Sequence, residues 1–276
     1  NEILNIDKIT YASNNPSLSQ RDIDKITNKN FCLTDLKMTS DAVFEFDPDI
    51  IVNFAAESHV DRSIEDPNAF LESNIKSTFN LLESYRQLIK DKGKKEKRFI
   101  HISTDEVFGS LSKNDKPFTE ESNIDPSSPY AATKGSSDLL VKAWNKTYDL
   151  PLIITNCSNN FGPFQNPEKL IPNIIYRINN GLPIEIYGDG SNIRDWIYVE
   201  DHVDAILSVV EKGRIGETYN IGGLCEMDNN SIANVLIERV SKFKKLDKNK
   251  ILNNLKYVED RPGHDFRYAM NISKIQ

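Results

Sequence analysis

A tyrosine and a lysine four residues apart, Tyr130 and Lys134, follow closely on a Thr-Asp-Glu run at residues 104–106. Residues at this spacing share one face of a helix, so we expect the phenol and the ammonium to be neighbours. An ammonium near a phenol lowers the pKa of the phenol, which can then act as a base nearer neutral pH. An adjacent Asp and Glu can divide acid and base roles if their environments separate their pKa values. Together these residues predict redox chemistry at a sugar hydroxyl, followed by a proton-assisted elimination.

Both motifs fall at the ends of predicted secondary-structure elements. An apolar strand over residues 99–103 ends directly before Thr104, and Ser128-Pro129 supplies a cap and a first-turn proline for the helix that carries Tyr130. Hydrophobic patterns predict further strands over 2–6, 49–54, 152–155 and 219–221, and further helices from Asp66 to about 89, over 203–210 and over 232–240. Strands that alternate with helices predict a parallel sheet with helices on both faces.

Ligands of such a sheet bind beyond the carboxyl ends of its strands. Asp7, residues 55–58 and residues 104–106 all fall at such ends and should converge on one crevice. Asp7 can accept hydrogen bonds from an adenosine ribose, which favours NAD over its phosphorylated form. An ordinary turn residue is an equal interpretation of Asp7, and Lys8 can attract a phosphate. The glycine-rich dinucleotide motif is absent, because the first glycine of the chain is Gly93.

Other candidate residues are weaker when they are taken singly. The Tyr-xxx-Lys spacing occurs by chance on many helices. His101 alternates inward on its strand and is interpreted as a core residue rather than a ligand. Arg194, Arg261 and His264 supply positive groups that suit a diphosphate, although each alone reads as a surface residue.

The composition describes a globular protein rather than a disordered one. The chain has 276 residues, 38% hydrophobic and 27% charged, with a net charge of −7, which argues against a nucleic-acid binder but allows a phosphorylated ligand in a local basic pocket. Cys32, Cys157 and Cys225 form no CxxC pair, which indicates free thiols in a reducing compartment, the cytoplasm. The four histidines lack metal-ligand spacing, so no metal is expected. No apolar run approaches the roughly 20 residues of a membrane span.

The chain resembles the dTDP-glucose 4,6-dehydratases of the extended short-chain dehydrogenase/reductase family over almost its whole length. The segments that carry the resemblance are 7–11, 55–63, 103–109, 126–134, 155–163, 168–172, 193–201, 219–223 and 260–265. The Tyr-xxx-Lys pair marks only the superfamily. Thr-Asp-Glu is more specific, because related epimerases and decarboxylases typically carry other residues there and GDP-mannose dehydratases resemble Thr-Ser-Glu.

The resemblance implies a Rossmann-like doubly wound parallel sheet with a smaller α/β substrate-binding domain. The NAD-binding domain is expected over 1–163 and 197–222, and the nucleotide-sugar-binding domain over 164–196 and 223–276. The family's first strand, its glycine-rich loop and a C-terminal stretch are expected to be missing, which should leave a gap or exposed edges in the sheet. A cytoplasmic homodimer is expected, with a helical bundle built from residues 66–88 and 136–148.

The resemblance also implies a role for each residue of the two motifs. Tyr130, assisted by Thr104 and Lys134, takes the proton from the glucose C4 hydroxyl while a hydride passes from C4 to NAD. Glu106 then removes the C5 proton, Asp105 protonates the departing C6 hydroxyl, and water leaves. The hydride returns to C6, which gives dTDP-4-keto-6-deoxyglucose.

Two sets of binding residues follow from the same resemblance. The residues expected to contact NAD are Asp7, Lys8, Thr10, Asp35, Leu36, Ala55, Ala56, Ser58, Thr78, Tyr130, Lys134 and Asn160. The residues expected to line the nucleotide-sugar site are Ser58, Thr104, Asn159, Lys169, Leu170, Ile186, Tyr187, Arg194, Asn229, Arg261, His264 and Tyr268.

Two other functions stay open at this point. One is a different NAD-dependent nucleotide-sugar enzyme, either a 4-epimerase or a UDP-sugar dehydratase. The Asp105–Glu106 pair argues against the epimerase, because epimerisation needs neither an eliminating acid nor a C5 base. The other is a non-catalytic remnant that still binds a sugar nucleotide, which the missing glycine-rich loop motivates. The nucleotide base and the pathway served, dTDP-rhamnose or another deoxysugar, are also open.

Overall fold

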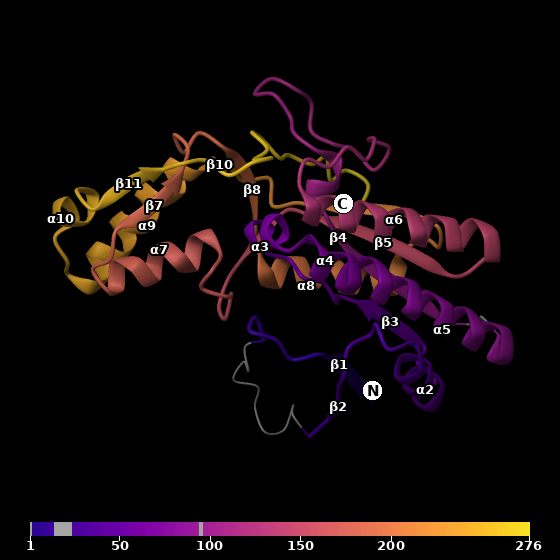
Figure 1. Ribbon diagram of the computed structural model, residues 1–276. Helices are drawn as coiled ribbons and strands as arrows, with labels where there is room; N and C mark the ends of the chain where they lie inside the picture. Colours follow the sequence, from indigo (N-terminus) through magenta and orange to yellow (C-terminus); the bar gives the residue numbers. More distant parts are fainter. Residues whose placement is uncertain (1, 14–23, 94–95) are drawn as a thin grey trace.

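A parallel sheet of four strands forms the centre of the protein (Figure 1). The computed structural model describes residues 2–13, 24–93 and 96–276. In sheet order the strands are β3 (Ile50–Asn53), β4 (Arg98–Thr104), β5 (Leu152–Cys157) and β9 (Thr218–Ile221). Each neighbouring pair is parallel, so all four carboxyl ends lie at one edge of the sheet. The predicted parallel α/β fold is confirmed.

Helices cover both faces of this sheet, because β4 and β5 are apolar on both sides. The covering helices are α5 (Ser77–Lys92), α6 (Pro129–Tyr148) and α8 (Val199–Lys212). Leu82 of α5 and Val141 of α6 share one core cluster with Phe99 of β4. On the opposite face, Ile206 of α8 shares a second cluster with Ile100 of β4. The sheet is therefore doubly wound, as the sequence predicts.

The first described elements form a separate small unit beside the main sheet. They are β1 (Ile3–Asp7), β2 (Ile26–Asn30) and α2 (Leu36–Phe46). β1 and β2 pair in parallel as their own two-stranded sheet. Among the residues described, β3 is hydrogen-bonded to a strand on one side only. Within the described residues, these two sheets are therefore not joined by hydrogen bonds between strands.

A second lobe has its own hydrophobic core, to the left in Figure 1. It contains α7 (Leu170–Asn179), β7 (Ile184–Tyr187), α9 (Asn229–Lys244), α10 (Lys248–Leu252) and β11 (Leu255–Val258). Ile174, Ile184 and Ile237 belong to this core. A three-stranded sheet leads to it, with the strands β6 (Asn159–Phe161), β8 (Ile193–Tyr198) and β10 (Glu226–Asp228). The domain boundaries given above stay a prediction.

Two predicted helix starts have different outcomes. The Ser128 hydroxyl accepts a hydrogen bond from the Ala131 N–H at 3.2 Å, which confirms the cap of α6. Asp66 is the N-cap of α4 (Pro67–Phe70) and Pro67 is its first residue, as predicted, although the Asp66 side chain makes no capping hydrogen bond. The predicted single helix is divided in the structure: α4 is followed by a π-helical turn (Leu71–Lys76) and then by α5. Another short helix, α3 (Val60–Glu65), precedes α4. Within the described ranges, no helix is both long and apolar enough to cross a membrane.

Candidate active site

The Thr-Asp-Glu run forms a capped turn at the carboxyl end of β4. Thr104 is the last residue of the strand, and a 3-10 turn (Asp105–Phe108) follows it. The Thr104 hydroxyl accepts a hydrogen bond from the Glu106 N–H at 3.3 Å and donates one to Asp105 Oδ1 at 3.2 Å. Asp105 is 1% exposed. A threonine at this position therefore fixes where both carboxyl groups leave the strand.

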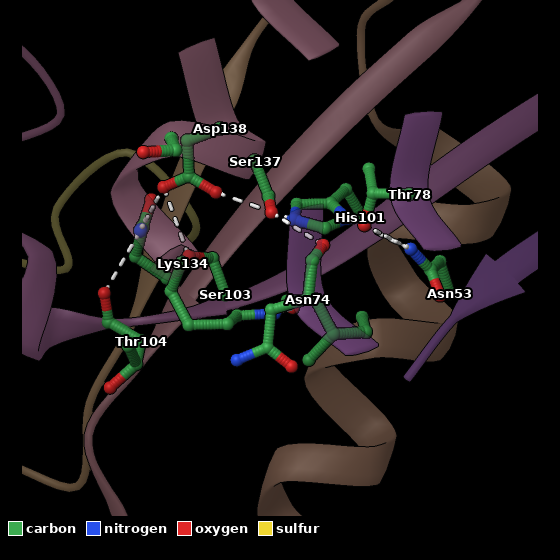
Figure 2. A network of polar contacts seen from close by, with 12 residues as sticks. Asn53, Asn74, Thr78, His101, Ser103, Thr104, Lys134, Ser137 and Asp138 are labelled. Atoms are coloured by element: carbon green, nitrogen blue, oxygen red, sulfur yellow. Dashed lines mark hydrogen bonds and ion pairs between the residues drawn. The ribbon is translucent and has the colours of Figure 1, made fainter. Parts of the chain in front are cut away.

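Tyr130 and Lys134 lie in the first two turns of α6, and both side chains are buried. The Tyr130 N–H donates to the Ser63 hydroxyl at 3.1 Å, and its ring meets Phe70 edge-on, with 6.3 Å between the ring centres. Lys134 Nζ donates to the carbonyl oxygen of Ile102 in β4 at 2.7 Å. α6 is thus held alongside the strand that ends in Thr104, and Figure 2 shows Lys134 lying next to that strand end.

The two carboxyl groups of the turn have different surroundings. Burial, reinforced by the charge of Glu106, raises the pKa of Asp105 well above its usual value. Burial also raises the pKa of Glu106, but the positive charges of Arg261, Arg194 and Lys169 oppose that rise. Asp105 is therefore suited to donate a proton and Glu106 to accept one, which is how neighbouring carboxyl groups divide acid and base work.

The phenol of Tyr130 departs from the sequence expectation. Burial, reinforced by the negative charge of Glu106, raises its pKa well above the usual value, and a hydrogen bond with Thr104 only partly opposes this. The expected lowering by Lys134 was wrong for this structure. The physical reason is that the ammonium is directed to the Ile102 carbonyl, and burial lowers the pKa of Lys134 itself.

Three predicted nucleotide-sugar residues supply the positive charges that face Glu106. Arg194 is buried, donates to the backbone oxygens of residues 193 and 265 at 2.7 and 3.0 Å, and lies 4.3 Å from the centre of the Tyr268 ring. Arg261 Nη1 donates to Asp61 Oδ1 at 3.2 Å. Lys169 Nζ donates to the Ser58 backbone oxygen at 2.7 Å. The structure thus gathers residues from distant segments beside the Thr-Asp-Glu turn.

Other members of that set surround this group less directly. Tyr268 donates its hydroxyl to Asp265 at 2.5 Å, and Tyr187 donates to Asp61 at 3.1 Å. His264 Nδ1 lies 2.6 Å from Asp260. Three more residues occupy element ends or starts, namely Asn159 in β6, Leu170 at the start of α7 and Asn229 at the start of α9.

Ile186 does not fit its predicted role. Its side chain is 1% exposed and packs in the core of the second lobe. The strand β7 alternates, so that Ile184 and Ile186 point inward while Glu185 and Tyr187 point outward. The prediction that the Ile186 side chain lines a ligand surface was therefore wrong.

Half of the twelve predicted NAD residues lie at or just after the carboxyl ends of β1 and β3. Asp7 Oδ1 accepts the Ile9 N–H at 2.7 Å, which is the turn arrangement considered as its alternative. Lys8 donates to the Ser73 hydroxyl at 2.6 Å and pairs with Glu57 at 2.7 Å. The hydroxyl of Thr10 accepts from a neighbouring backbone N–H, and Ala55, Ala56 and Ser58 directly follow β3.

The remaining predicted NAD residues have protein partners of their own. Thr78 is 1% exposed and accepts a hydrogen bond from Asn53 at 3.3 Å, and Asn160 Oδ1 lies 2.8 Å from His202 Nδ1. Asp35 is the N-cap of α2 and accepts the Met38 N–H at 2.9 Å. The side chain of Leu36, which starts that helix, is exposed. A helix-capping role thus accounts for Asp35, and the NAD contacts of Asp35 and Leu36 stay a prediction.

Several buried polar atoms of the predicted site residues and their neighbours lack partners in the part of the chain that the structure describes. Asp105 Oδ2, Ser158 Oγ, Asn159 Oδ1 and Arg261 Nε are buried, and none has a hydrogen-bond partner among the described residues. Buried polar groups are normally paired, because an unpaired one costs about 1–3 kcal/mol. These atoms, together with the Tyr130, Lys134 and Thr104 groups, suit a cofactor that carries hydroxyl and amide groups. No cluster of His, Cys, Asp or Glu within the described part of the chain is arranged to hold a metal ion.

The sequence analysis missed two residues of this region. Asp61 contacts both Tyr187 and Arg261, although they are far away in the chain. Asp138 lies one helical turn beyond Lys134 and is almost fully buried. A carboxylate four residues after Lys134 was a visible signal for Asp138. For Asp61, its place in the segment 55–63 was the available signal.

Comparisons with known proteins find several dTDP-glucose 4,6-dehydratases that are similar to this chain. The GDP-mannose 4,6 dehydratase family model matches residues 2–276. The chain is 48% identical over 291 residues to the dTDP-glucose 4,6-dehydratase of Salmonella typhimurium and 46% identical over 282 residues to that of Neisseria meningitidis, covering 99% of this chain and 79% of each relative. The crystal structure of DesIV, a dTDP-glucose 4,6-dehydratase from Streptomyces venezuelae with NAD bound, is similar at a TM-score of 0.89 and 38% identity, over 99% of this chain and 80% of that one.

Proposed function

This chain belongs to the dTDP-glucose 4,6-dehydratase family, and on that premise we propose that it converts dTDP-glucose to dTDP-4-keto-6-deoxyglucose with the residues of the crevice described above. The observation that carries the proposal is the Thr104-Asp105-Glu106 turn at the end of β4, in which Thr104 and Asp105 are buried and Glu106 feels the positive charges of Arg261, Arg194 and Lys169. An epimerase needs no such pair of carboxyl groups, because it removes no water.

The residues that would hold NAD are Lys134 and the groups that follow β1 and β3, among them Asp7, Ala55 and Ser58. The chemistry that NAD supplies when bound is reversible hydride transfer, out of C4 of the glucose first and into C6 at the end. The Lys134 ammonium has three protons, so it can keep its bond to the Ile102 carbonyl and still donate to a second acceptor.

Tyr130 takes the proton of the glucose C4 hydroxyl, with the Thr104 hydroxyl as its partner. Because burial raises the pKa of the phenol, forming its base needs a nearby positive charge. In this structure the Lys134 ammonium is directed to the Ile102 carbonyl, so Lys134 would supply that charge by turning another of its protons toward the phenol. Loss of this proton from oxygen, together with loss of the C4 hydride, would leave C4 as a ketone.

The C4 ketone makes the neighbouring C5 proton acidic, and Glu106 removes it. Asp105 gives its own proton to the C6 hydroxyl, the C6–O bond breaks, and water leaves as a C5–C6 double bond forms. Asp105 suits the acid role because burial keeps it protonated, whereas the nearby cations favour the charged form of Glu106.

The test of this function is product mass. The protein is incubated with NAD and with dTDP-glucose that carries deuterium at C4, and the product is analysed for loss of one water and for the position of the label. Loss of water with deuterium at C6 is expected. Unchanged substrate after exhaustive incubation would refute the assignment, and a parallel incubation with UDP-glucose shows whether the nucleotide base is the reason.

We propose that the protein forms a homodimer through α5 and α6. Phe79, Leu139 and Tyr148 on these helices are 39%, 55% and 45% exposed. Exposed apolar side chains that gather on adjacent helices typically mark a protein–protein contact. We expect Leu139→Asp to sediment as a monomer and the unchanged protein as a dimer, whereas equal sedimentation of both would contradict this surface.

The free thiols of the three cysteines support a cytoplasmic location.

A further inference from the structure

Asp138 is a buried carboxylate that the proposed reaction does not use. It lies on α6, its side chain is 3% exposed, and donors from two strands converge on it. The Ser103 hydroxyl donates to Oδ2 at 2.9 Å, and Asn156 Nδ2 donates to the same oxygen at 3.2 Å. His101 Nε2 lies 3.4 Å from Oδ1, which is an ion-pair distance without hydrogen-bond alignment. Figure 2 shows this network beside Lys134.

The network fixes which atoms carry protons. The Ala55 N–H donates to Asn53 Oδ1 at 3.2 Å, so the amide group of Asn53 turns its Nδ2 toward His101 Nδ1, 3.2 Å away. His101 Nδ1 is then the acceptor, and the ring proton resides on Nε2, which faces Asp138. Burial, aided by the charge of Lys134, lowers the pKa of His101, so the ring is neutral at pH 7. Ser103 and Asn156 therefore donate to Asp138 and His101 turns its N–H toward it, which suits a charged carboxylate.

The same network joins the two catalytic motifs. Asn156 Nδ2 donates to the Thr104 backbone oxygen at 3.0 Å as well as to Asp138. Asp138 thus links α6, which carries Tyr130 and Lys134, to the carboxyl ends of β4 and β5. The bond from Lys134 to Ile102 provides a second tie between α6 and β4. Two ties one helical turn apart prevent both sliding and rotation of the helix against the strand.

We propose that Asp138 is a positioning residue for the redox step: it ties the helix that carries Tyr130 and Lys134 to the strand end that carries Thr104, and its charge compensates the Lys134 ammonium. This proposal rests on the proposed function for its kinetic consequence. The titratable groups that surround the ammonium are Asp138 on α6, Cys157 on β5 and His101 on β4. Cys157 is uncharged, because burial raises the pKa of its thiol to about 12.

The direction of the charge effect follows from these surroundings. Burial lowers the pKa of Lys134, and the charge of Asp138 works against that lowering. Asp138→Asn removes the charge but keeps the shape, and its amide NH₂ meets groups that are themselves donors. The variant should therefore lower the pKa of Lys134 and loosen the tie to Ser103 and Asn156.

The matched control is Ser137→Ala on the same turn of α6. It removes hydrogen bonds to the backbone oxygens of Asn74 and Thr133, at 2.7 and 2.9 Å, but changes no charge. The first readout is an NMR titration of isotope-labelled lysine side chains, with the Lys134 signal assigned from its loss in Lys134→Met. This readout needs neither substrate nor NAD, so it stands even if the proposed function fails. We expect a lower pKa in Asp138→Asn and an unchanged one in Ser137→Ala.

The second readout is kinetic. We expect kcat of Asp138→Asn to fall about tenfold, which corresponds to about 1.4 kcal/mol, with the alkaline limb of its pH–rate profile displaced to lower pH. The proposal would be overturned if Asp138→Asn and Ser137→Ala had the same Lys134 pKa and the same normalised pH–rate profile. If Asp138→Asn does not fold, two other variants are compared in its place. Asp138→Glu keeps the charge and Asp138→Ser removes it. Equal Lys134 pKa values in those two variants would refute the proposal as well.

Discussion

Replacing Asp105 with asparagine tests the division of labour between the two carboxyl groups. Asparagine has the same shape as a protonated aspartic acid and can still accept the Thr104 hydroxyl hydrogen bond, which spans 3.2 Å in the structure. It has no acidic proton to give to the C6 hydroxyl. Because general acid catalysis contributes about 10²–10⁴-fold, we expect the rate of water loss to fall by that factor.

The same substitution should stabilise the protein at neutral pH. Burial raises the pKa of Asp105 in the folded state above its value in the unfolded chain, so the folded state holds the proton more tightly. The contribution of Asp105 to stability is therefore fully present below the unfolded-state pKa and is lost as pH rises through the folded-state pKa. Each unit of difference between the folded-state and unfolded-state pKa changes the free energy of unfolding by about 1.36 kcal/mol. Asp105→Asn does not lose this stability, because asparagine does not ionise.

Two assays separate these effects. Mass spectrometry of quenched reactions with C4-deuterated dTDP-glucose measures water loss, and the absorbance of reduced NAD reports whether oxidation still occurs. Urea unfolding at several pH values measures stability. We expect Asp105→Asn to retain oxidation, to lose elimination, and to gain stability over the unchanged protein at pH 7 but not at acidic pH.

Asp204→Asn on α8 is the matched control, because it makes the same chemical change at an exposed position. It should leave elimination and the pH dependence of stability unchanged. Water loss by Asp105→Asn within about tenfold of the control rate would show that Asp105 is not the acid. Equal stability of the two variants across the pH range would show that Asp105 is not held protonated.

Three further predictions concern other residues. Glu106→Gln should stop exchange of the C5 proton with deuterated solvent, as read by product mass, and lower kcat by about 10²–10⁴-fold while C4 oxidation persists. Arg261→Ala should weaken dTDP binding roughly tenfold or more by titration calorimetry, because a charged donor is lost, whereas Arg239→Ala on α9, outside the predicted site, should change it little. Burial lowers the pKa of His202 to about 4, so stability falls as pH drops from about 6.5 toward 4; His202→Gln should show a smaller loss in urea unfolding.

Local patterns were enough to predict the elements that carry the chemistry. The short apolar run before Thr104 predicted a buried strand, and the structure confirms that β4 ends at Thr104. Ser128-Pro129 specified the first turn of α6, because a hydroxyl cap and a proline both fit the unpaired N–H groups there. The same approach failed at Ile186, since an apolar residue on an alternating strand reads the same whether it lines a ligand or fills a core.

The sequence by itself determined which residue types stand at the strand ends and on one face of α6, because these depend on neighbours within a few positions. Only the tertiary structure decided their electrostatics. The pKa values of Asp105, Glu106 and Tyr130 depend on burial and on charges brought from distant segments, such as Arg261. Asp61 meets Arg261 across 200 positions of the chain, and Ser103 meets Asp138 across 35. Such contacts exist only once the chain has folded, since no local pattern brings those atoms together.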